Sequence, residues 1–325
     1  MKKKSLTRLI LILPFLISSQ LKSQNINFKN FQALNEDFFF LEQESKTVLG
    51  SYYHLGRDSV IKDILKAGRG PFEIENIGAF SYDNTSERLF VGDISNGKII
   101  SYNLSGVPIL ENTLKIPYLI NLDAYDGKLV ASQGILLRDS KNLANYPLAF
   151  ILDQNSIEIT DTLFFDLRKL QLDTIENSPK VKIFEIRPQV IALENDLFLA
   201  TFQSVSTIFL IDSESDVLAS ATLKIPGFQG MKIIEHPRYG YGQIMYSVLN
   251  DFVRIKDSIY LSFGHKSKGI PPGVVSVEVI NGNALKTNTF LVDETDILTN
   301  QFIITTDGIK IYGTNGTKIF PLTFK

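Results

Sequence analysis

The chain has 325 residues, and its 33 basic side chains nearly balance its 35 acidic ones, for a formal net charge of −2. Nucleic-acid binding needs an excess of basic side chains, so this composition gives it little support. The sequence contains no cysteine, so no disulfide can stabilise the protein. With 44% hydrophobic residues, the chain can instead build a large core.

The first 23 residues are typical of a secretory signal. Lys2 to Lys4 and Arg8 precede an apolar run at residues 9–17, and small residues follow it. The run is about half of the roughly 20 residues that span a bilayer. A buried helix of the folded domain is the alternative interpretation. Cleavage is expected near Ser19 or Ser23, with a single domain over residues 24–325.

The location that this signal implies is outside the cytoplasm. No cysteine follows the apolar run, which excludes a lipid-anchored lipoprotein. No later segment is long and apolar enough to cross a membrane. We therefore expect a periplasmic or secreted protein with no membrane span in the mature chain.

One pattern recurs six times along the chain: alternating apolar residues, a tight polar turn, and apolar residues again. Such spacing predicts β-hairpins, because Asp-Gly, Asn-Asp and Asp-Ser tolerate the left-handed backbone of tight turns. The shorter intervals between turns match one four-stranded propeller blade. The six copies cover residues 31–40, 79–91, 122–131, 190–199, 252–261 and 302–311.

A second hairpin follows the first in five of the six copies. The last copy has a third strand at residues 318–324, and the segment 26–28 lies where a missing fourth strand would. The sequence therefore predicts an all-β, six-bladed β-propeller with four-stranded antiparallel blades, in which the N-terminal strand completes the last blade and closes the ring. A two-sheet sandwich is the alternative. The second hairpins cover residues 47–65, 98–116, 148–165, 207–225 and 274–292.

The segment Ala67-Gly-Arg-Gly-Pro-Phe72, continued by a Leu89-Phe-Val-Gly-Asp93 strand and a Ser105-Gly106 turn, resembles an NHL-type repeat. It resembles more closely the exported, TolB-like six-bladed propellers common in Bacteroidetes, although Phe72-Glu73 follows Pro71 without a further Gly-Glu. The resemblance implies a propeller fold with no assigned chemistry for most members. The glycines and proline can also be explained as a tight connection between blades, which would not need Arg69.

Loop lengths predict which face of the propeller carries function. Turns between first and second strands, and between third and fourth strands, share one face and are short. Links between blades and between second and third strands share the other face, and they hold the long segments, where binding residues usually lie. Basic and aromatic side chains there would suit a polar or anionic ligand, although solvated loop charges are the alternative. The candidate ligand-binding residues are Arg69, His236, Arg238, Tyr239, Tyr241, His265 and Lys266.

Catalytic and metal motifs are not evident. The three histidines lack ligand spacing, and no Gly-x-Ser-x-Gly elbow or phosphate-binding glycine loop occurs. We expect no catalytic residue, metal or cofactor, and a non-catalytic protein that recruits a small anionic molecule, peptide or envelope protein through the loop-rich face. The alternative is a metal-dependent hydrolase of the lactonase or gluconolactonase type, with its site at the mouth of the central channel. Its ligands would come from Glu75, Asn76, Asn121, Asn250 and Asp251.

Overall fold

The computed structural model describes most of the chain from residue 28 onward. Statements about structure refer to these residues alone. They are residues 28–34, 38–43, 46–57, 59–114, 116, 118–137, 143–170, 184–203, 205–228, 232–236, 240–244, 249–255, 258–265, 270–291, 303–304, 311–314 and 319–322.

Five four-stranded antiparallel sheets make up most of the fold. Sheet 1 contains β1 (Phe28–Ala33), β2 (Phe38–Gln43), β3 (Val48–His54) and β4 (Ser59–Lys66). Sheet 2 contains β5 (Ile77–Asp83), β6 (Arg88–Asp93), β7 (Lys98–Asn103) and β8 (Pro108–Thr113). Sheet 3 contains β9 (Leu119–Tyr125), β10 (Lys128–Gln133), β12 (Tyr146–Asp153) and β13 (Ile159–Phe165).

The remaining sheets follow the same plan. Sheet 4 contains β15 (Pro188–Ala192), β16 (Leu197–Phe202), β17 (Val205–Asp212) and β18 (Val217–Thr222). Sheet 5 contains β21 (Leu249–Ile255), β22 (Ser258–His265), β23 (Ile270–Ile280) and β24 (Ala284–Leu291). A three-stranded C-terminal sheet contains β25 (Ile303–Ile304), β26 (Ile311–Thr314) and β27 (Ile319–Leu322).

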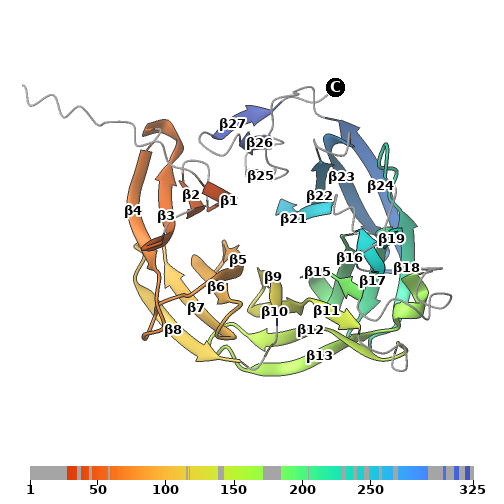
Figure 1. The fold of residues 1–325 in the computed structure, drawn as a ribbon, viewed down its shortest axis with the longest axis horizontal. Coiled ribbons are helices and arrows are strands. Elements are labelled where there is room, and N and C mark those ends of the chain that lie inside the picture. The colour runs from red at the N-terminus through yellow and green to blue at the C-terminus, as the bar shows by residue number, and fades with distance from the viewer. Residues whose placement is uncertain are drawn as a thin grey trace, which may run out of the picture.

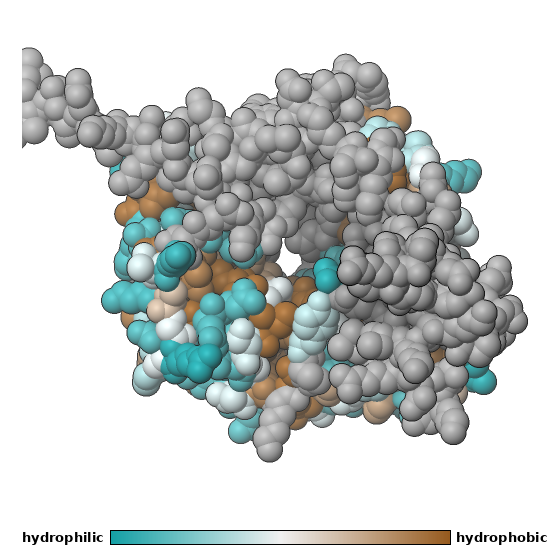
Figure 2. All heavy atoms as spheres, viewed as in Figure 1, coloured by the Kyte–Doolittle hydropathy of each residue, from teal (hydrophilic) through white to brown (hydrophobic). Residues whose placement is uncertain are grey.

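The sheets are arranged radially around a central axis (Figure 1). Their first strands, β1, β5, β9, β15 and β21, are innermost, and each contacts the first strand of the next sheet. Strand β25 contacts both β1 and β21. The space-filling view shows an opening at the centre of the molecule (Figure 2). This is the arrangement of a β-propeller, so the predicted all-β propeller is confirmed and the two-sheet sandwich is wrong.

The tight turns have the backbone conformation that their residues predict. Asp126 and Gly127 join β9 to β10 with φ of 48° and 77°. Asn281 and Gly282 join β23 to β24 with φ of 49° and 69°, and Asn195 has φ of 57° before β16. Asn, Asp and Gly adopt this left-handed region at the lowest steric cost. The turn expected at residue 257 lies outside the described residues.

The core lies in the seams between neighbouring sheets. Middle strands are covered on both faces, so segments such as 89–91 and 129–131 are fully buried without alternation. Between sheets 3 and 4, the ring centroid of Phe165 lies 5.3 Å from that of Phe202 and 5.1 Å from that of Phe209. Burying each such side chain stabilises the fold by about 1.5–3 kcal/mol.

The innermost strands are joined by a repeated side-chain hydrogen bond. Ser81 on β5 accepts from the backbone N–H of Ala124 on β9, at 2.9 Å. Asp123 on β9 accepts in the same way from Ala192 on β15, at 2.8 Å. Both acceptors lie two residues before the end of their strand, and both donors pair with the second residue of the following strand. The bond satisfies edge N–H groups that neighbouring sheets cannot pair.

The predicted ring closure requires a correction at Phe28. This residue begins β1 and pairs with Gln43 of β2, so it belongs to the innermost strand of sheet 1 and not to the last blade. Closure of the ring by the residues before β1 stays a prediction. Residues 26–27 and 323–325 lie outside the described residues.

Candidate functional site

The face that carries the links between sheets, here called the link face, also carries every additional strand in the described residues. β11 (Ile135–Leu137), in the link between β10 and β12, pairs with β14 (Phe184–Ile186), in the link between β13 and β15. β19 (Lys232–His236) pairs with β20 (Gly240–Ile244), in the link between β18 and β21. Two two-stranded ribbons, β11–β14 and β19–β20, therefore lie within links that the sequence predicted to be long (Figure 1).

The opposite face, here called the tight-turn face, is occupied by polar contacts between neighbouring sheets. Arg88 of sheet 2 donates from Nη1 to Oδ1 of Asn155 of sheet 3, at 3.4 Å. Lys128 of sheet 3 forms an ion pair with Asp196 in the turn between β15 and β16 of sheet 4. Exposed contacts of this kind add little stability individually. They give Arg88 and Lys128 partners within the protein, and we therefore consider the link face the better candidate for recognition.

Arg187 and Tyr118 meet at the foot of the β11–β14 ribbon. Arg187 lies between β14 and β15, and Tyr118 lies in the link immediately before β9. Nη2 of Arg187 donates to the Tyr118 hydroxyl at 3.0 Å, and the guanidinium carbon lies 6.0 Å from the centroid of the Tyr118 ring. Both side chains are half-buried. A guanidinium and a phenol are thus brought together from segments 69 residues apart.

Tyr118 is held in an unusual backbone conformation. Its φ is 56°, in the left-handed region, which is a genuine outlier for a bulky residue. Its carbonyl accepts from the N–H of Gly134 at 2.8 Å, and a Cβ on residue 134 would overlap the Tyr118 ring. Strain of this kind persists where the surroundings impose it, and it clusters at ligand-binding positions.

Polar groups continue from this pair into the seam between sheets 3 and 4. Oδ1 of Asn121 accepts from the N–H of Val190 at 3.3 Å. Ser132 pairs directly with Asn121 across β9 and β10, so the two side chains lie on the same face. The Ser132 hydroxyl is fully buried and has no hydrogen-bond partner within the described part of the chain. Asn121 and Ser132 therefore make this end of the seam polar, next to the apolar core between sheets 3 and 4.

The predicted candidate Arg69 lies in the link between β4 and β5. Its Nη2 lies 2.6 Å from Oε1 of Glu75, and this hydrogen bond raises the pKa of the guanidinium. The Arg69 side chain is 76% exposed. The link therefore supplies Arg69 with a partner, and whether Arg69 also binds a ligand stays a prediction.

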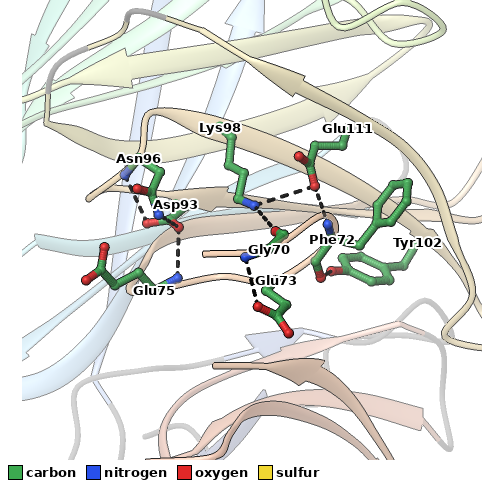
Figure 3. Close-up of polar contacts among 9 residues, drawn as sticks. All are labelled: Gly70, Phe72, Glu73, Glu75, Asp93, Asn96, Lys98, Tyr102 and Glu111. Carbon is green, nitrogen blue, oxygen red and sulfur yellow. Dashed lines mark hydrogen bonds and ion pairs between the residues drawn. The ribbon is translucent and has the colours of Figure 1, made fainter. Parts of the chain in front are cut away.

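The glycine-rich string around Arg69 is built as a structural connection (Figure 3). The N–H of Gly70 donates to Oε2 of Glu73 at 2.8 Å, and a Cβ on residue 70 would lie 2.8 Å from that oxygen. Buried Lys98 donates to the carbonyl of Gly70 at 3.0 Å and lies 3.5 Å from Glu111. The same Glu111 carboxylate accepts from the N–H of Phe72. These contacts support the interpretation that the string shapes the connection between the first two sheets.

Asp93 fixes the other end of this link. Its buried carboxylate accepts from the N–H of Glu75 at 2.8 Å and from the side-chain amide of Asn96 at 2.8 Å (Figure 3). It also accepts from the N–H groups of Asn76 at 3.3 Å and Ser95 at 2.9 Å. A carboxylate with this many donors is satisfied within the protein and serves the fold.

The cluster predicted at residues 236–241 belongs to the β19–β20 ribbon. His236 ends β19 opposite Gly240, and Tyr241 of β20 pairs with Glu235, so the ribbon brings the two ends of the cluster together. Arg238 and Tyr239, between the two strands, lie outside the described residues.

Of the two remaining predicted residues, His265 ends β22, where the chain leaves the strand toward β23 on the link face. Lys266 lies outside the described residues. The link that contains Arg69 joins β4 to β5, across the ring from the β19–β20 ribbon (Figure 1). The structure therefore does not gather Arg69 into the 236–241 cluster.

Sequence reasoning missed Tyr118 and Arg187. The only local signal is that each adjoins a proline, at Pro117 and Pro188, immediately before an innermost strand. Their contact depends on the pairing of β11 with β14, two three-residue strands that no sequence period marks.

The residues proposed for a metal-dependent hydrolase are used differently where the structure describes them. The Glu75 carboxylate pairs with Arg69, and the Asn121 amide accepts from the backbone of β15. Asn250 and Asp251 lie in β21, but their side chains are outside the described part. Among the side chains that the structure describes, no three His, Cys, Asp or Glu residues are grouped as a metal site. Nor does any helix in the described ranges have the length and hydropathy to span a bilayer.

Comparison with solved structures supports the fold. The chain superposes on a member of the DUF4221 family from Bacteroides vulgatus ATCC 8482 with a TM-score of 0.60 and 10% identity, over 93% of this chain and 94% of that one. Kuenenia stuttgartiensis hydrazine synthase gives a TM-score of 0.50 and 11% identity, over 92% of this chain and 76% of that one. A Bacteroides fragilis NCTC 9343 protein, provisionally described as exported, gives 0.49 and 11% identity over 93% and 92%.

These likenesses extend to architecture alone. At such low identities, a shared fold does not imply a shared function. No protein-family model matches the sequence, and no curated protein matches it. Function must therefore be argued from the site.

Proposed function

We propose that the protein is an exported, non-catalytic binding propeller that recruits a small anionic molecule, peptide or envelope protein through its link face. The observation that carries this proposal is the asymmetry of the two faces. The link face bears both ribbons and the Arg187–Tyr118 pair, whereas the tight-turn face bears short turns joined to one another. Rigid scaffolds commonly place recognition on their longest connecting segments.

We further propose that the C-terminal sheet is the sixth blade of a closed ring of the NHL-like or TolB-like type. The contacts of β25 with both β1 and β21 support this arrangement. Closure would remove the exposed strand edges that an open stack of sheets would leave. The basic and apolar leader at residues 1–23 supports export to the periplasm or beyond the cell.

The placement of the binding surface can be tested with a double variant at residues 238 and 239, which lie between β19 and β20 in the sequence. Thermal-shift screening of the wild type against organic acids and short peptides should identify ligands that raise the melting temperature. We expect Arg238→Ala combined with Tyr239→Ala to abolish those shifts without changing the melting temperature of the ligand-free protein.

The matched control is Arg88→Ala, which removes one cation from the tight-turn face. This variant should keep the ligand-induced shifts. Loss of the shifts in Arg88→Ala, with their retention in the double variant, would assign recognition to the wrong face and reject the proposal.

A further inference from the structure

We propose that two copies of this protein pair through the outer edge of β18, so that sheet 4 of one copy continues antiparallel into sheet 4 of the other. β18 is the outermost strand of sheet 4, and among the described strands it pairs only with β17. It lies at the outer perimeter of the ring (Figure 1). Alternate N–H and C=O groups of such an edge point away from the sheet and readily pair with an added strand.

The composition of β18 distinguishes this edge from those of the other four-stranded sheets. Proteins protect exposed edges with charged residues or proline. The strand reads Val-Leu-Ala-Ser-Ala-Thr over Val217–Thr222, with neither a charge nor a proline. The outermost strands of the other four sheets each contain at least one charged residue, such as Lys62 in β4, Glu111 in β8, Asp161 in β13 and Lys286 in β24. β18 is therefore the least protected of these five edges.

Side chains alternate along β18 between a packed row and an exposed row. Ala219 and Ala221 pack against the core between sheets 4 and 5. Leu218, between the tight turn and these alanines, is 40% exposed. The exposed row continues beyond both ends of the strand, so it begins with an acid and ends with a base. Its members are Asp216, Leu218, Ser220, Thr222 and Lys224.

The order of charges in this row favours a second copy of the chain in antiparallel orientation. When two identical strands pair about Ser220, Asp216 of each copy lies beside Lys224 of the other. Neither charged side chain forms an ion pair with another residue in the described ranges. Parallel pairing would instead bring like charges together, which is unfavourable. Charge complementarity therefore points to a two-fold dimer.

The expected contact is small. Ser220 would face the same residue of the other copy, with Leu218 beside Thr222 on either side. The ladder between β17 and β18 shifts register at Leu218, so we expect the new hydrogen bonds mainly at residues 219–221. β18 has six residues, whereas stable interfaces use about 20–30 residues on each side. The dimer should therefore be weak, with a dissociation constant in the micromolar range.

This pairing would leave the link face of each copy open. β18 begins after the tight turn that follows β17 and ends at the link to β19, so it runs from the tight-turn face toward the link face. Antiparallel pairing therefore turns the link faces of the two copies in opposite directions. The dimer would present two separate recognition surfaces.

Analytical ultracentrifugation of the mature protein over a concentration series tests this pairing. We expect the mass to rise from one chain to two through the micromolar range. Ser220→Lys places two ammonium groups at the centre of the contact and should weaken dimerisation roughly tenfold. The matched control is Asn288→Lys, which adds the same charge at an exposed position of β24 and should dimerise like the wild type.

Charge reversal tests the antiparallel orientation. Asp216→Lys and Lys224→Asp, made singly, each bring like charges together twice per dimer and should weaken it by about three- to tenfold. The two substitutions in one chain restore opposite charges, so the double variant should recover most of the wild-type affinity. Circular dichroism and melting temperature should show that all the variants are folded.

Three outcomes would overturn the proposal. The first is a wild-type protein that remains monomeric at about 100 μM. The second is a folded Ser220→Lys variant that dimerises as well as the Asn288→Lys control, because the interface would then lie elsewhere. The third is a double charge-reversal variant that dimerises no better than the single variants. None of these measurements requires a ligand, so the proposed binding function stands or fails separately.

Discussion

Steric crowding at Tyr118 explains why residue 134 is glycine. The Gly134 Cα approaches the phenol ring so closely that a methyl group there would overlap it. Gly127 is glycine for a different reason: its φ is 77°, and a Cβ there would meet nothing within 4 Å. Crowding therefore requires glycine at residue 134, whereas the backbone conformation favours glycine at residue 127.

This difference gives a prediction for two matched variants. Gly134→Ala should lower the free energy of unfolding by about 1–3 kcal/mol through overpacking against the Tyr118 ring. Gly127→Ala should cost about 1–2 kcal/mol from its left-handed backbone alone. Urea unfolding measures both changes. A Gly134→Ala protein as stable as the wild type would contradict the close contact between residue 134 and Tyr118.

Side-chain hydrogen bonds join the innermost strands of neighbouring sheets at two junctions. Asp123→Ala should leave the N–H of Ala192 without its acceptor and lower the free energy of unfolding by about 1–3 kcal/mol. Asp123→Asn retains an acceptor oxygen and should recover most of that loss. Urea denaturation of the three proteins tests this, and an Asn variant as unstable as the Ala variant would show that the oxygen is not what matters.

Three tyrosines between sheets 1 and 2 should make the fold sensitive to alkali. Burial, followed by the charges of Glu87 and Asp83, raises the pKa of Tyr82 from 10.0 to about 12. Burial also raises the pKa of Tyr52 and of Tyr102. Above pH 10 the unfolded chain loses these protons while the folded protein retains them, so stability falls as pH rises from about 10 toward 12.

Tyrosinate absorbance and circular dichroism, followed together through this range, measure the effect. We expect these tyrosines to ionise only as the fold is lost. Tyr82→Phe should remove part of the pH dependence. Complete ionisation of every tyrosine near pH 10, in a protein that remains folded, would contradict the burial described here.

At the level of strands and turns, the sequence predicted local hairpins correctly but did not predict which distant segments pair. Asp126-Gly127 and Asn281-Gly282 mark their turns because the left-handed backbone restricts which residues fit. The β11–β14 ribbon joins residues 135–137 to 184–186, and nothing in either short segment specifies the other. Phe28 was misplaced because alternating apolar residues do not distinguish an innermost strand from an outermost one.

In the whole molecule, the radial arrangement of the sheets determines on which face each connecting segment lies. Links of the same type lie on one face, so the long segments could be assigned to a face from the sequence. The residues that meet there could not, because Tyr118 and Arg187 are brought together by two separate links. His236 and Tyr241 are close in the sequence and lie on the two strands of one ribbon, so their proximity could be expected from the sequence. Their role in binding stays a prediction.

Export is a prediction for the intact chain. Expression of the full-length protein in a bacterium should yield a mature form that lacks the residues up to about 19 or 23, detected in the periplasm or medium by intact-mass spectrometry. An uncleaved protein that remains in the cytoplasm would contradict the signal-peptide interpretation.

Hydrogen–deuterium exchange with and without a saturating ligand from the thermal-shift screen tests the central claim most directly, because it reports on both faces in one measurement. We expect slower exchange in the link-face ribbons, at residues 135–137, 184–186, 232–236 and 240–244. We expect no change in the tight turns at residues 84–88, 104–107 and 213–216. Protection confined to those turns, with none in the ribbons, would contradict recognition by the link face.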